Sequence, residues 1–199
     1  MPDWDARYAE PGWAFGTEPN DFLREHAHEL PAGSRVLCLA EGEGRNAVWL
    51  AQQGFEVTGI DIASVGLEKA QRLATERGVK LVTQVADLAT FEFGDSAWGG
   101  IVSIFAHVPP DVRRRVHAQV LRALEPGGVL LLEAYRPQQL ERGTGGPPDD
   151  ARMLDLERLR PELGSLEWRL AREVERDVIE GRYHTGRAST VQLVARRPA

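Results

Sequence analysis

The chain has 199 residues, of which 42% are hydrophobic and 27% charged, as in an ordinary globular protein. No apolar run approaches the roughly 18 residues of a membrane span, the polar N-terminus is unlike a signal peptide, and one cysteine excludes an internal disulfide. The net charge of −6 argues against nucleic acid as a partner, and the basic cluster Arg113–Arg115 fits a solvated helix face. We expect a cytoplasmic protein, monomeric or homodimeric, that binds a small molecule and has no metal site.

The first half of the chain consists of short segments separated by turn residues. Short apolar runs predict buried strands, whereas longer segments with apolar residues three and four positions apart predict helices. Asn20 and Ser64 are expected to begin helices, and Gly54 and Gly78 to end them. The expected elements are a helix from residue 20, a strand at 36–39, a helix at 45–53, a strand at 55–60, a helix at 64–77, and strands at 80–86 and 100–106.

The second half changes in character after a further helix and strand. A segment rich in glycine, proline and charge predicts a loop that is able to cover a site. Two long runs then flank a tight turn at Gly181, as in a β-hairpin. The expected elements are a helix at 111–124 capped by Asp111, a strand at 129–135, the loop at 136–150, a short helix at 150–163, and strands at 166–179 and 183–196.

The order of these elements predicts the fold class. Strands that alternate with helices are typical of an α/β fold with a mostly parallel twisted sheet and helices on both faces. The C-terminal hairpin is expected to be antiparallel, at one edge of a seven-stranded sheet. We expect a single domain over 1–199, with an N-terminal lid and helix at 1–30, a ligand-binding core at 31–135, and a loop, helix and edge hairpin at 136–199.

The segment AEGEGRNA, residues 40–47, has the glycine spacing of a nucleotide-binding turn between a strand and a helix. In open α/β sheets, ligands bind beyond the carboxyl ends of the strands, where the strand order reverses. Gly42 and Gly44 would let the backbone approach a ligand closely. Asp61, which lies 19 residues after Gly42, is placed to accept hydrogen bonds from ribose hydroxyls. These features predict a ligand with an adenosine part.

Glu41 and Glu43 distinguish two classes of adenosine cofactor. A dinucleotide would place phosphates against these acids, and two like charges about 4 Å apart at an effective dielectric near 20 cost on the order of 4 kcal/mol. S-adenosylmethionine has no phosphate and carries an ammonium and a sulfonium. Both glutamates can also point into water, yet only Arg45 in the loop is then able to offset a pyrophosphate. The loop therefore favours S-adenosylmethionine over a nicotinamide dinucleotide.

Five motifs follow one another within residues 34–135, namely VLCLAEGEGRNA, VTGIDIA, VADLATFEF, GIVSIFAHVP and LEPGGVLLLEAY. Their order closely resembles that of class I S-adenosylmethionine-dependent methyltransferases. The flanking segments WDARYAEPGWAFGTEPNDFL and EGRYHTGRASTVQL look like the small methyltransferases grouped with the tellurite-resistance enzyme. The resemblance implies a Rossmann-like methyltransferase fold, S-adenosylmethionine as cofactor, S-adenosylhomocysteine as product, and a small-molecule acceptor such as a thiol or a metalloid oxyanion.

The resemblance also implies which residues contact the cofactor. Four N-terminal residues would fold over the site as a lid, and the remaining residues come from the loops that follow the strands. The implied set is Gly42 and Gly44 at the methionine part, Asp61 at the ribose, Asp87 at the adenine amino group, Ile62 and Leu88 on the two sides of the ring, Phe105 and Ala106 at the ammonium, Ala40, Glu41 and Asn46 in the first loop, and Trp4, Tyr8, Phe15 and Gly16 as the lid.

Two positions depart from the family pattern. Cys38 stands where an acid is usual, and Ala40 stands where a glycine is usual. Glu41 is expected to supply the missing carboxylate. Cys38 lies in the middle of an aliphatic strand, which favours a buried packing residue over a nucleophile.

Four residues are candidates for a catalytic role. Methyl transfer is an in-line displacement, so alignment contributes about 7–11 kcal/mol, and only a protonated oxygen or nitrogen acceptor needs a general base. His107 follows the fourth strand, His184 lies in the terminal hairpin, and Glu133 and Tyr135 end the fifth strand. Each has a structural alternative, such as a backbone hydrogen bond or a partly exposed strand position.

Two alternatives to a small-molecule methyltransferase stay open. One is a nicotinamide-dependent oxidoreductase, for which residues 41–43 are unfavourable. The other is a non-catalytic S-adenosylmethionine-binding module, in which the four catalytic candidates are dispensable. Methylation of a protein or nucleic acid is disfavoured because no basic groove or added domain is evident. The acceptor is not encoded in a readable motif, because one fold carries many chemistries.

Overall fold

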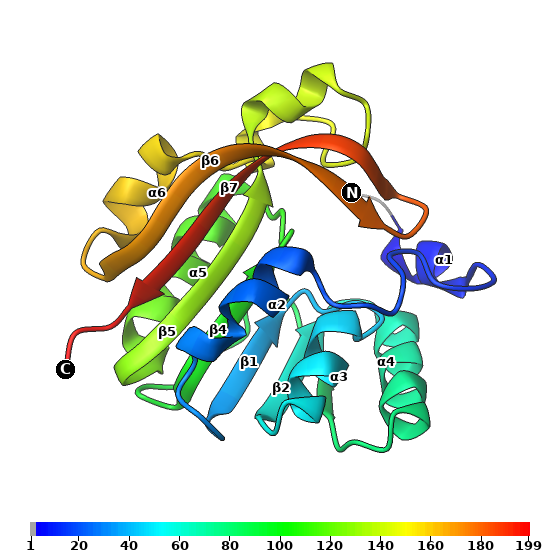
Figure 1. Cartoon of the computed structure of the whole chain (residues 1–199), viewed down its shortest axis with the longest axis horizontal. Helices are drawn as coiled ribbons and strands as arrows, with labels where there is room; N and C mark the ends of the chain where they lie inside the picture. Colours follow the sequence, from blue (N-terminus) through cyan, green and yellow to red (C-terminus); the bar gives the residue numbers. More distant parts are fainter. Residues whose placement is uncertain (1–2) are drawn as a thin grey trace.

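The computed structural model describes residues 3–199, which form a seven-stranded sheet in the order β3-β2-β1-β4-β5-β7-β6 (Figure 1). The strands from β3 to β5 are parallel, and β7 pairs antiparallel with both β5 and β6. The predicted mostly parallel sheet with an antiparallel edge hairpin is therefore confirmed. The strands are β1 Arg35–Leu39, β2 Glu56–Asp61, β3 Val82–Val85, β4 Trp98–Ile104, β5 Leu124–Tyr135, β6 Glu167–Glu180 and β7 His184–Arg196.

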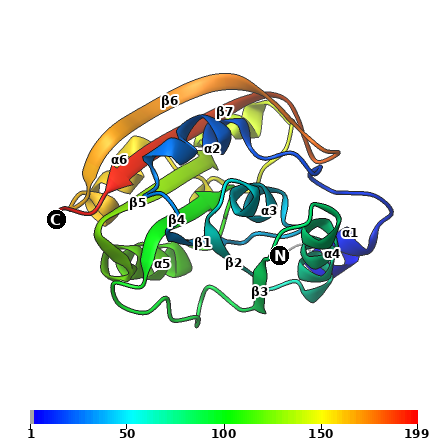
Figure 2. The ribbon, with the colours of Figure 1, turned by 60° about the horizontal axis from the view of Figure 1, so that its bottom comes forward.

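Helices cover both faces of the sheet (Figure 2). Helices α5 and α6 pack on one face, and α2, α3 and α4 pack on the other. Helix α1 lies beside α4, near the tip of the β6–β7 hairpin (Figure 1). None of the helices within residues 3–199 is both long and apolar enough to cross a bilayer. The helices are α1 Trp4–Ala9, α2 Asp21–His26, α3 Arg45–Gln52, α4 Ser64–Glu76, α5 Pro110–Ala123 and α6 Leu156–Leu163, with 3-10 turns at Ala27–Glu29, Pro137–Glu141 and Asp150–Arg152.

Alternate residues of the central strands fill two separate cores. Leu37 and Leu39 of β1 pack with α5 and α6, whereas Val36 and Cys38 pack with the helices of the opposite face. All four side chains are at most 2% exposed. A strand that is buried on both faces needs apolar residues at every position, which explains the continuous run VLCL. Burial also raises the pKa of the Cys38 thiol well above its ordinary value, so this residue packs and does not ionise.

Strand β5 begins earlier than predicted. It starts at Leu124, which pairs with Trp98, and the pairing then continues from Gly100 opposite Val129. The register shift between Trp98 and Gly100 accommodates the EPGG segment as an irregularity within the strand. The turn residues therefore bend the strand locally and do not precede it.

Three predicted helix starts also differ. Ser64 and Asp111 are not N-caps, because α4 is capped by Ala63 and α5 by Pro109, neither of which uses its side chain. The segment predicted as one helix at 150–163 is interrupted. Helix α6 begins only after Asp155, whose carboxylate accepts the backbone N–H of Arg158 at 2.7 Å.

The basic cluster in α5 is a solvated face only in part, because Arg114 is exposed and Arg115 partly exposed, whereas Arg113 is not. Arg113 is buried, and its Nη2 lies 2.9 Å from Oε1 of Glu162 in α6. The other oxygen of Glu162 lies 2.6 Å from Nδ1 of His117. This cluster joins α5 to α6 and leaves Arg113 unavailable to an external anion.

Candidate active site

A cavity of about 530 Å³ lies at the carboxyl ends of the parallel strands, where the strand order reverses between β1 and β4. Loops after β1, β2, β3 and β4 form its floor, and three other segments close it. The lining includes Trp4, Arg7, Tyr8, Phe15 and Gly16 of the N-terminal segment, Ala40, Glu41, Glu43, Arg45 and Asn46 of the first loop, Asp61, Ile62, Asp87 and Leu88 after β2 and β3, Phe105 and His107 after β4, Gly145–Pro148 and Arg152 before α6, and Tyr183 and His184 at the hairpin tip.

Ala40 and Phe105 have left-handed backbone conformations at the floor of the cavity. Their φ angles are 49° and 54°, and they follow β1 and β4, which are neighbours in the sheet. A residue with a Cβ costs about 1–2 kcal/mol in this conformation, and such strain concentrates at functional sites. The usual glycine at position 40 thus has a physical reason, and Ala40 adopts the same turn with strain.

The glycines of the first loop serve packing within the protein. Gly42 and Gly44 have φ angles of 59° and 91°, and neither lines the cavity. A Cβ at position 42 would lie 2.5 Å from the hydroxyl of Tyr8, and one at position 44 would lie 2.5 Å from the Cβ of Ala70. The structure therefore places Tyr8 and α4, not the cavity, directly against these two positions.

The two glutamates of the loop are buried, so the alternative in which they point into water is wrong. Oε1 of Glu43 lies 2.7 Å from Nζ of Lys69, and Oε2 accepts the backbone N–H of Ala14 at 2.7 Å. Oε1 of Glu41 accepts the N–H groups of Asn46 and Ala47 at 3.1 and 2.8 Å, and so caps α3 in place of an N-cap side chain. Burial raises the pKa of Glu41 to about 7.

Residues predicted to hold an adenosine converge on one side of the cavity. Asp61 accepts the N–H groups of Gly42 and Ala63, each at 2.8 Å, and burial raises its pKa. These two bonds fix the carboxylate against the cavity. The predicted ring neighbours Ile62 and Leu88 line the same region, as does Asp87, whose Oδ1 accepts the N–H of Ala89 at 2.8 Å; these four predicted contacts, Asp61 included, stay predictions.

Arg45 presents a free donor beside the cavity. Its Nη2 lies 2.6 Å from Oε2 of Glu180, whereas its buried Nη1 has no hydrogen-bond partner among the described residues. An unpaired buried N–H is unfavourable, and a carboxylate is its strongest partner. Sequence reasoning treated Arg45 only as a cation able to offset phosphate; its partner in β6 was not foreseeable. Asn46 has a structural role as well, because its Oδ1 accepts the N–H of Asn20 at 2.9 Å.

Two imidazoles form part of the opposite wall. Nε2 of His107 accepts the backbone N–H of Tyr135 at 3.0 Å, and burial lowers its pKa to about 3. Burial likewise lowers the pKa of His184, whose Nδ1 lies 3.7 Å from Oε2 of Glu180. Both rings are therefore neutral near pH 7, and His107 has its acceptor nitrogen already engaged.

Glu133 and Tyr135, also proposed from the sequence, do not line the cavity. Glu133 is fully buried and accepts hydrogen bonds from Asn20, Arg176 and Gln192. Tyr135 is fully buried too, and its ring stacks on Phe105 with 4.5 Å between centroids. Their positions suit a supporting role behind the wall. Ala106 is likewise absent from the lining.

The N-terminal segment covers the cavity and is tied to the hairpin tip. Trp4 stacks on Tyr8 with ring centroids 5.7 Å apart, and Phe15 lies 6.0 Å from Tyr183. The hydroxyl of Tyr183 lies 2.9 Å from both carboxylate oxygens of Glu10, and the N–H of Arg182 donates to the carbonyl of Ala14 at 2.9 Å. The four residues predicted to form a lid all line the cavity, as do Tyr183 of the hairpin and Gly145–Pro148 of the loop predicted to be able to cover a site. Val108 and Arg152 are lining residues that sequence reasoning missed.

Comparison with known proteins finds similarity to methyltransferases. The methyltransferase domain family matches residues 36–128. The 2-heptyl-1-hydroxyquinolin-4(1H)-one methyltransferase of Mycobacteroides abscessus is 28% identical over 142 residues, which covers 70% of this chain and 62% of the relative, less than two thirds of its length. A thiopurine S-methyltransferase of Pseudomonas fluorescens is 29% identical over 214 residues, covering 97% of this chain and 93% of the relative. Residues 36–128 thus match a methyltransferase domain, and the chain is similar to S-adenosylmethionine-dependent methyltransferases.

Solved structures share the fold of this methyltransferase. The N-methyltransferase NodS of Bradyrhizobium japonicum, in complex with S-adenosylhomocysteine, superimposes with a TM-score of 0.72 at 17% identity and covers 98% of this chain and 97% of its own. TehB of Haemophilus influenzae gives a TM-score of 0.67 at 16% identity and covers 89% and 61%. At these identities the likeness concerns the fold alone.

The cofactor of this methyltransferase is S-adenosylmethionine, which excludes the nicotinamide alternative. The cavity residues fit that cofactor. Arg45 offers an unpaired N–H suited to the methionine carboxylate, Glu41 is an acid at the same loop suited to the ammonium, and Asp61 faces the cavity with a fixed carboxylate suited to the ribose.

Proposed function

We propose that this methyltransferase methylates a small, planar, weakly acidic acceptor, with an aromatic thiol as the first choice. The observation that carries the proposal is the wall opposite the cofactor loop, which combines aromatic rings with two neutral imidazoles. Phe15 lies 4.5 Å from His184, and Phe105 lies 4.9 Å from it, between ring centroids. Flat apolar walls of this kind favour a flat apolar ligand.

The chemistry of this wall favours an acceptor that gives up its proton easily. The cofactor supplies an activated methyl group, so the acceptor sulfur forms a bond to that carbon as the sulfonium–carbon bond breaks. His184, a neutral imidazole, takes the proton of an acceptor that reaches the cavity protonated, whereas an acceptor that arrives as a thiolate reacts without this step. A thiol ionises near pH 8.5 and a phenol near pH 10 by their ordinary pKa values, so a weak base of this kind serves a thiol better.

Two relatives support the proposal through their names. One is named for thiopurines and the other for a hydroxyquinolinone, and both names denote planar heteroaromatic acceptors. The net charge of −6 further favours a small molecule over a nucleic acid.

A metalloid oxyanion is the second candidate acceptor, because two arginines besides Arg45 line the cavity. The guanidinium of Arg7 lies 5.0 Å from the ring of Trp4 and 4.5 Å from that of Tyr183, and Arg152 lies 3.4 Å from Asp149. These cations are able to attract an anion. A metalloid oxyanion would gain nothing from the flat aromatic wall, whereas an aromatic thiol would pack against it. We therefore rank the thiol first.

The test has two parts. Calorimetry should show S-adenosylhomocysteine binding that Asp61→Ala weakens by about tenfold or more and that the exposed Asp95→Ala leaves unchanged. Methylation assays should then compare thiophenol, phenol and tellurite. We expect thiophenol to react at least about tenfold faster than phenol by kcat/KM. Equal rates for the two, or turnover of tellurite alone, would overturn the thiol proposal.

A further inference from the structure

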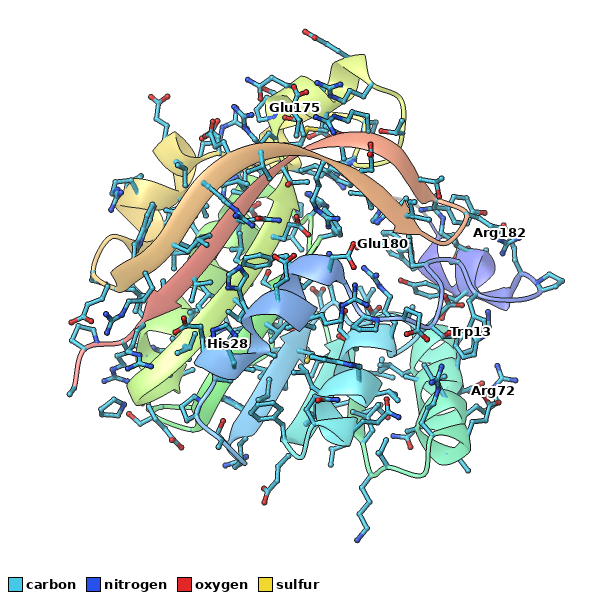
Figure 3. All side chains as sticks on the ribbon, viewed as in Figure 1. Trp13, His28, Arg72, Glu175, Glu180 and Arg182 are labelled. Carbon is cyan, nitrogen blue, oxygen red and sulfur yellow. The ribbon has the colours of Figure 1, made fainter. Side chains whose placement is uncertain are left out.

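One carboxylate oxygen of Glu180 faces two nitrogen groups, the guanidinium of Arg45 and the imidazole of His184. Glu180 ends β6 and is only 6% exposed; Figure 3 shows it beneath the hairpin ribbon, on the side of α2. Its Oε2 lies 2.6 Å from Nη2 of Arg45 and 3.7 Å from Nδ1 of His184. Its Oε1 is held separately, by Nδ2 of Asn20 at 2.8 Å. Arg45 belongs to the loop at residues 40–47, which we call the cofactor loop. His184 belongs to the wall on the other side of the cavity, which also contains Phe15 and Phe105.

Each of the two groups that face Oε2 also has an unpaired nitrogen. Nη1 of Arg45 and Nδ1 of His184 are both buried and lack a hydrogen-bond partner among residues 3–199. Both residues line the cavity. The bond from Arg45 occupies Oε2 at close range, so His184 stays beyond hydrogen-bonding distance of it.

We propose that Glu180 is a positioning residue that transmits cofactor binding from Arg45 to His184. When the carboxylate of the bound cofactor pairs with Nη1 of Arg45, it neutralises part of the positive charge of the guanidinium. The ion pair between Arg45 and Glu180 then becomes weaker. Oε2 of Glu180 then moves closer to His184 and accepts a hydrogen bond from its Nδ1–H. Hydrogen bonds that are long in the absence of ligand often shorten in this way when the ligand binds. That bond holds His184 in the tautomer with the proton on Nδ1. Nε2, on the far side of the ring, is then free to take the proton of the molecule that is methylated. Glu180 stays ionised throughout.

The role of His184 as proton acceptor rests on the proposed function, whereas the link between Arg45 and His184 does not. Several groups around the ring act on its protonation, and all of them except Glu180 are present in every variant that the test compares. They are Arg7 of α1, Arg45 of α3, His107 after β4 and Tyr135 of β5, in addition to Glu180 itself.

The chain offers a matched control for Glu180. Glu175 lies on the same strand but points to the other side of the hairpin (Figure 3), where it pairs with Arg142 and Arg187. Glu180→Gln removes the charge and keeps an amide oxygen for Asn20. Glu175→Gln removes an equal charge that does not face the cavity.

The test is an NMR titration of the His184 ring in the wild type, Glu180→Gln and Glu175→Gln. The chain has five histidines, and His184→Gln identifies the signal. We expect saturating S-adenosylhomocysteine to raise the His184 pKa by about half a unit or more in the wild type and in Glu175→Gln, through the new bond to Glu180. The direct field of the ligand acts equally in all three proteins, so only the additional rise reports the bond to Glu180, and the rise should be much smaller in Glu180→Gln.

Either of two results would overturn the proposal: no rise in the wild type, or an equal rise in Glu180→Gln. Thermal unfolding and ligand affinity of each variant verify that it is folded and saturated. The titration contains no methyl acceptor, so the pKa rise can be observed even if thiophenol is not a substrate. Conversely, thiophenol can be a substrate even if the pKa rise is not observed. Failure of the link and failure of the proposed function are therefore distinguishable.

Discussion

Nε2 of His107 accepts the backbone N–H of Tyr135 at 3.0 Å, which joins the loop after β4 to the end of β5. This bond commits the lone pair that a general base would use. It also explains why a histidine in a suggestive position is a structural residue: burial holds its pKa near 3, so it is neutral in the physiological range.

The first prediction concerns this bond. His107→Asn, which can present a side-chain oxygen to the same N–H, should lower kcat by less than about tenfold, whereas His184→Asn should lower it by about 100-fold or more. Steady-state kinetics with thiophenol, at a pH low enough for this acceptor to arrive protonated, provides the comparison. If His107→Asn were the more damaging of the two, the assignment of proton transfer to His184 would fail.

The second prediction concerns the strained turn at Ala40, whose φ is 49°. Ala40→Gly should raise the free energy of unfolding by about 1 kcal/mol, because glycine adopts the left-handed conformation without a Cβ clash. The same substitution at the buried helical residue Ala74 should lower it by about 1 kcal/mol or more. Urea unfolding measures both. Destabilisation by both substitutions would show that φ at position 40 is not the controlling factor.

The third prediction follows from the raised pKa of Glu41, which is about 7 against an ordinary value of 4.5. The folded chain holds this proton more tightly than the unfolded chain, so the contribution to stability is complete below about pH 4.5 and is lost as pH rises to about 7. Between about pH 5 and pH 8, the wild type should lose about 2–3 kcal/mol relative to Glu41→Gln. Parallel urea titrations of the two proteins isolate Glu41 from the other carboxylates, and a constant difference between them would contradict its raised pKa.

The fourth prediction concerns the contact between Tyr183 and Glu10, which ties the hairpin tip to the N-terminal cover. Tyr183→Phe removes the hydroxyl and keeps the ring. We expect dissociation of S-adenosylhomocysteine to become about three- to tenfold faster, because the cover opens more often, while the melting temperature stays unchanged. Stopped-flow displacement measures the rate. Glu18→Gln, an exposed change in the same segment, should leave it unaltered.

Much of the fold follows from local sequence patterns. The run VLCL predicts a doubly buried strand, and the turn at Gly181 predicts the antiparallel hairpin, since both depend on neighbouring residues only. The irregularity at the start of β5 depends on its pairing with Trp98, and the interrupted segment before α6 depends on capping by Asp155. Such features are set by contacts outside the local pattern.

The site was predictable to a similar extent. The loop after β1 and Asp61 could be placed because the fold brings strand ends together. The burial of Glu43 could not, because its partner Lys69 lies on α4, 26 positions further along the chain. The pairing of Arg45 with Glu180 spans 135 positions and exists only once the hairpin is in register. Sequence reasoning therefore located the cofactor side better than the acceptor side.

The Gly145–Pro148 loop gives the cavity a wall that is separate in sequence from the cofactor side. Residues 40–89 line the side proposed for the cofactor, whereas the wall near His184 comes from this loop, the hairpin tip, Phe15 and Phe105. A library of variants confined to residues 143–152 should therefore alter which acceptors are admitted without retuning cofactor affinity. Selectivity for the methyl acceptor can then change through substitutions in one short segment. Methyltransferases that bind the same cofactor can differ in their acceptors because they differ in this segment.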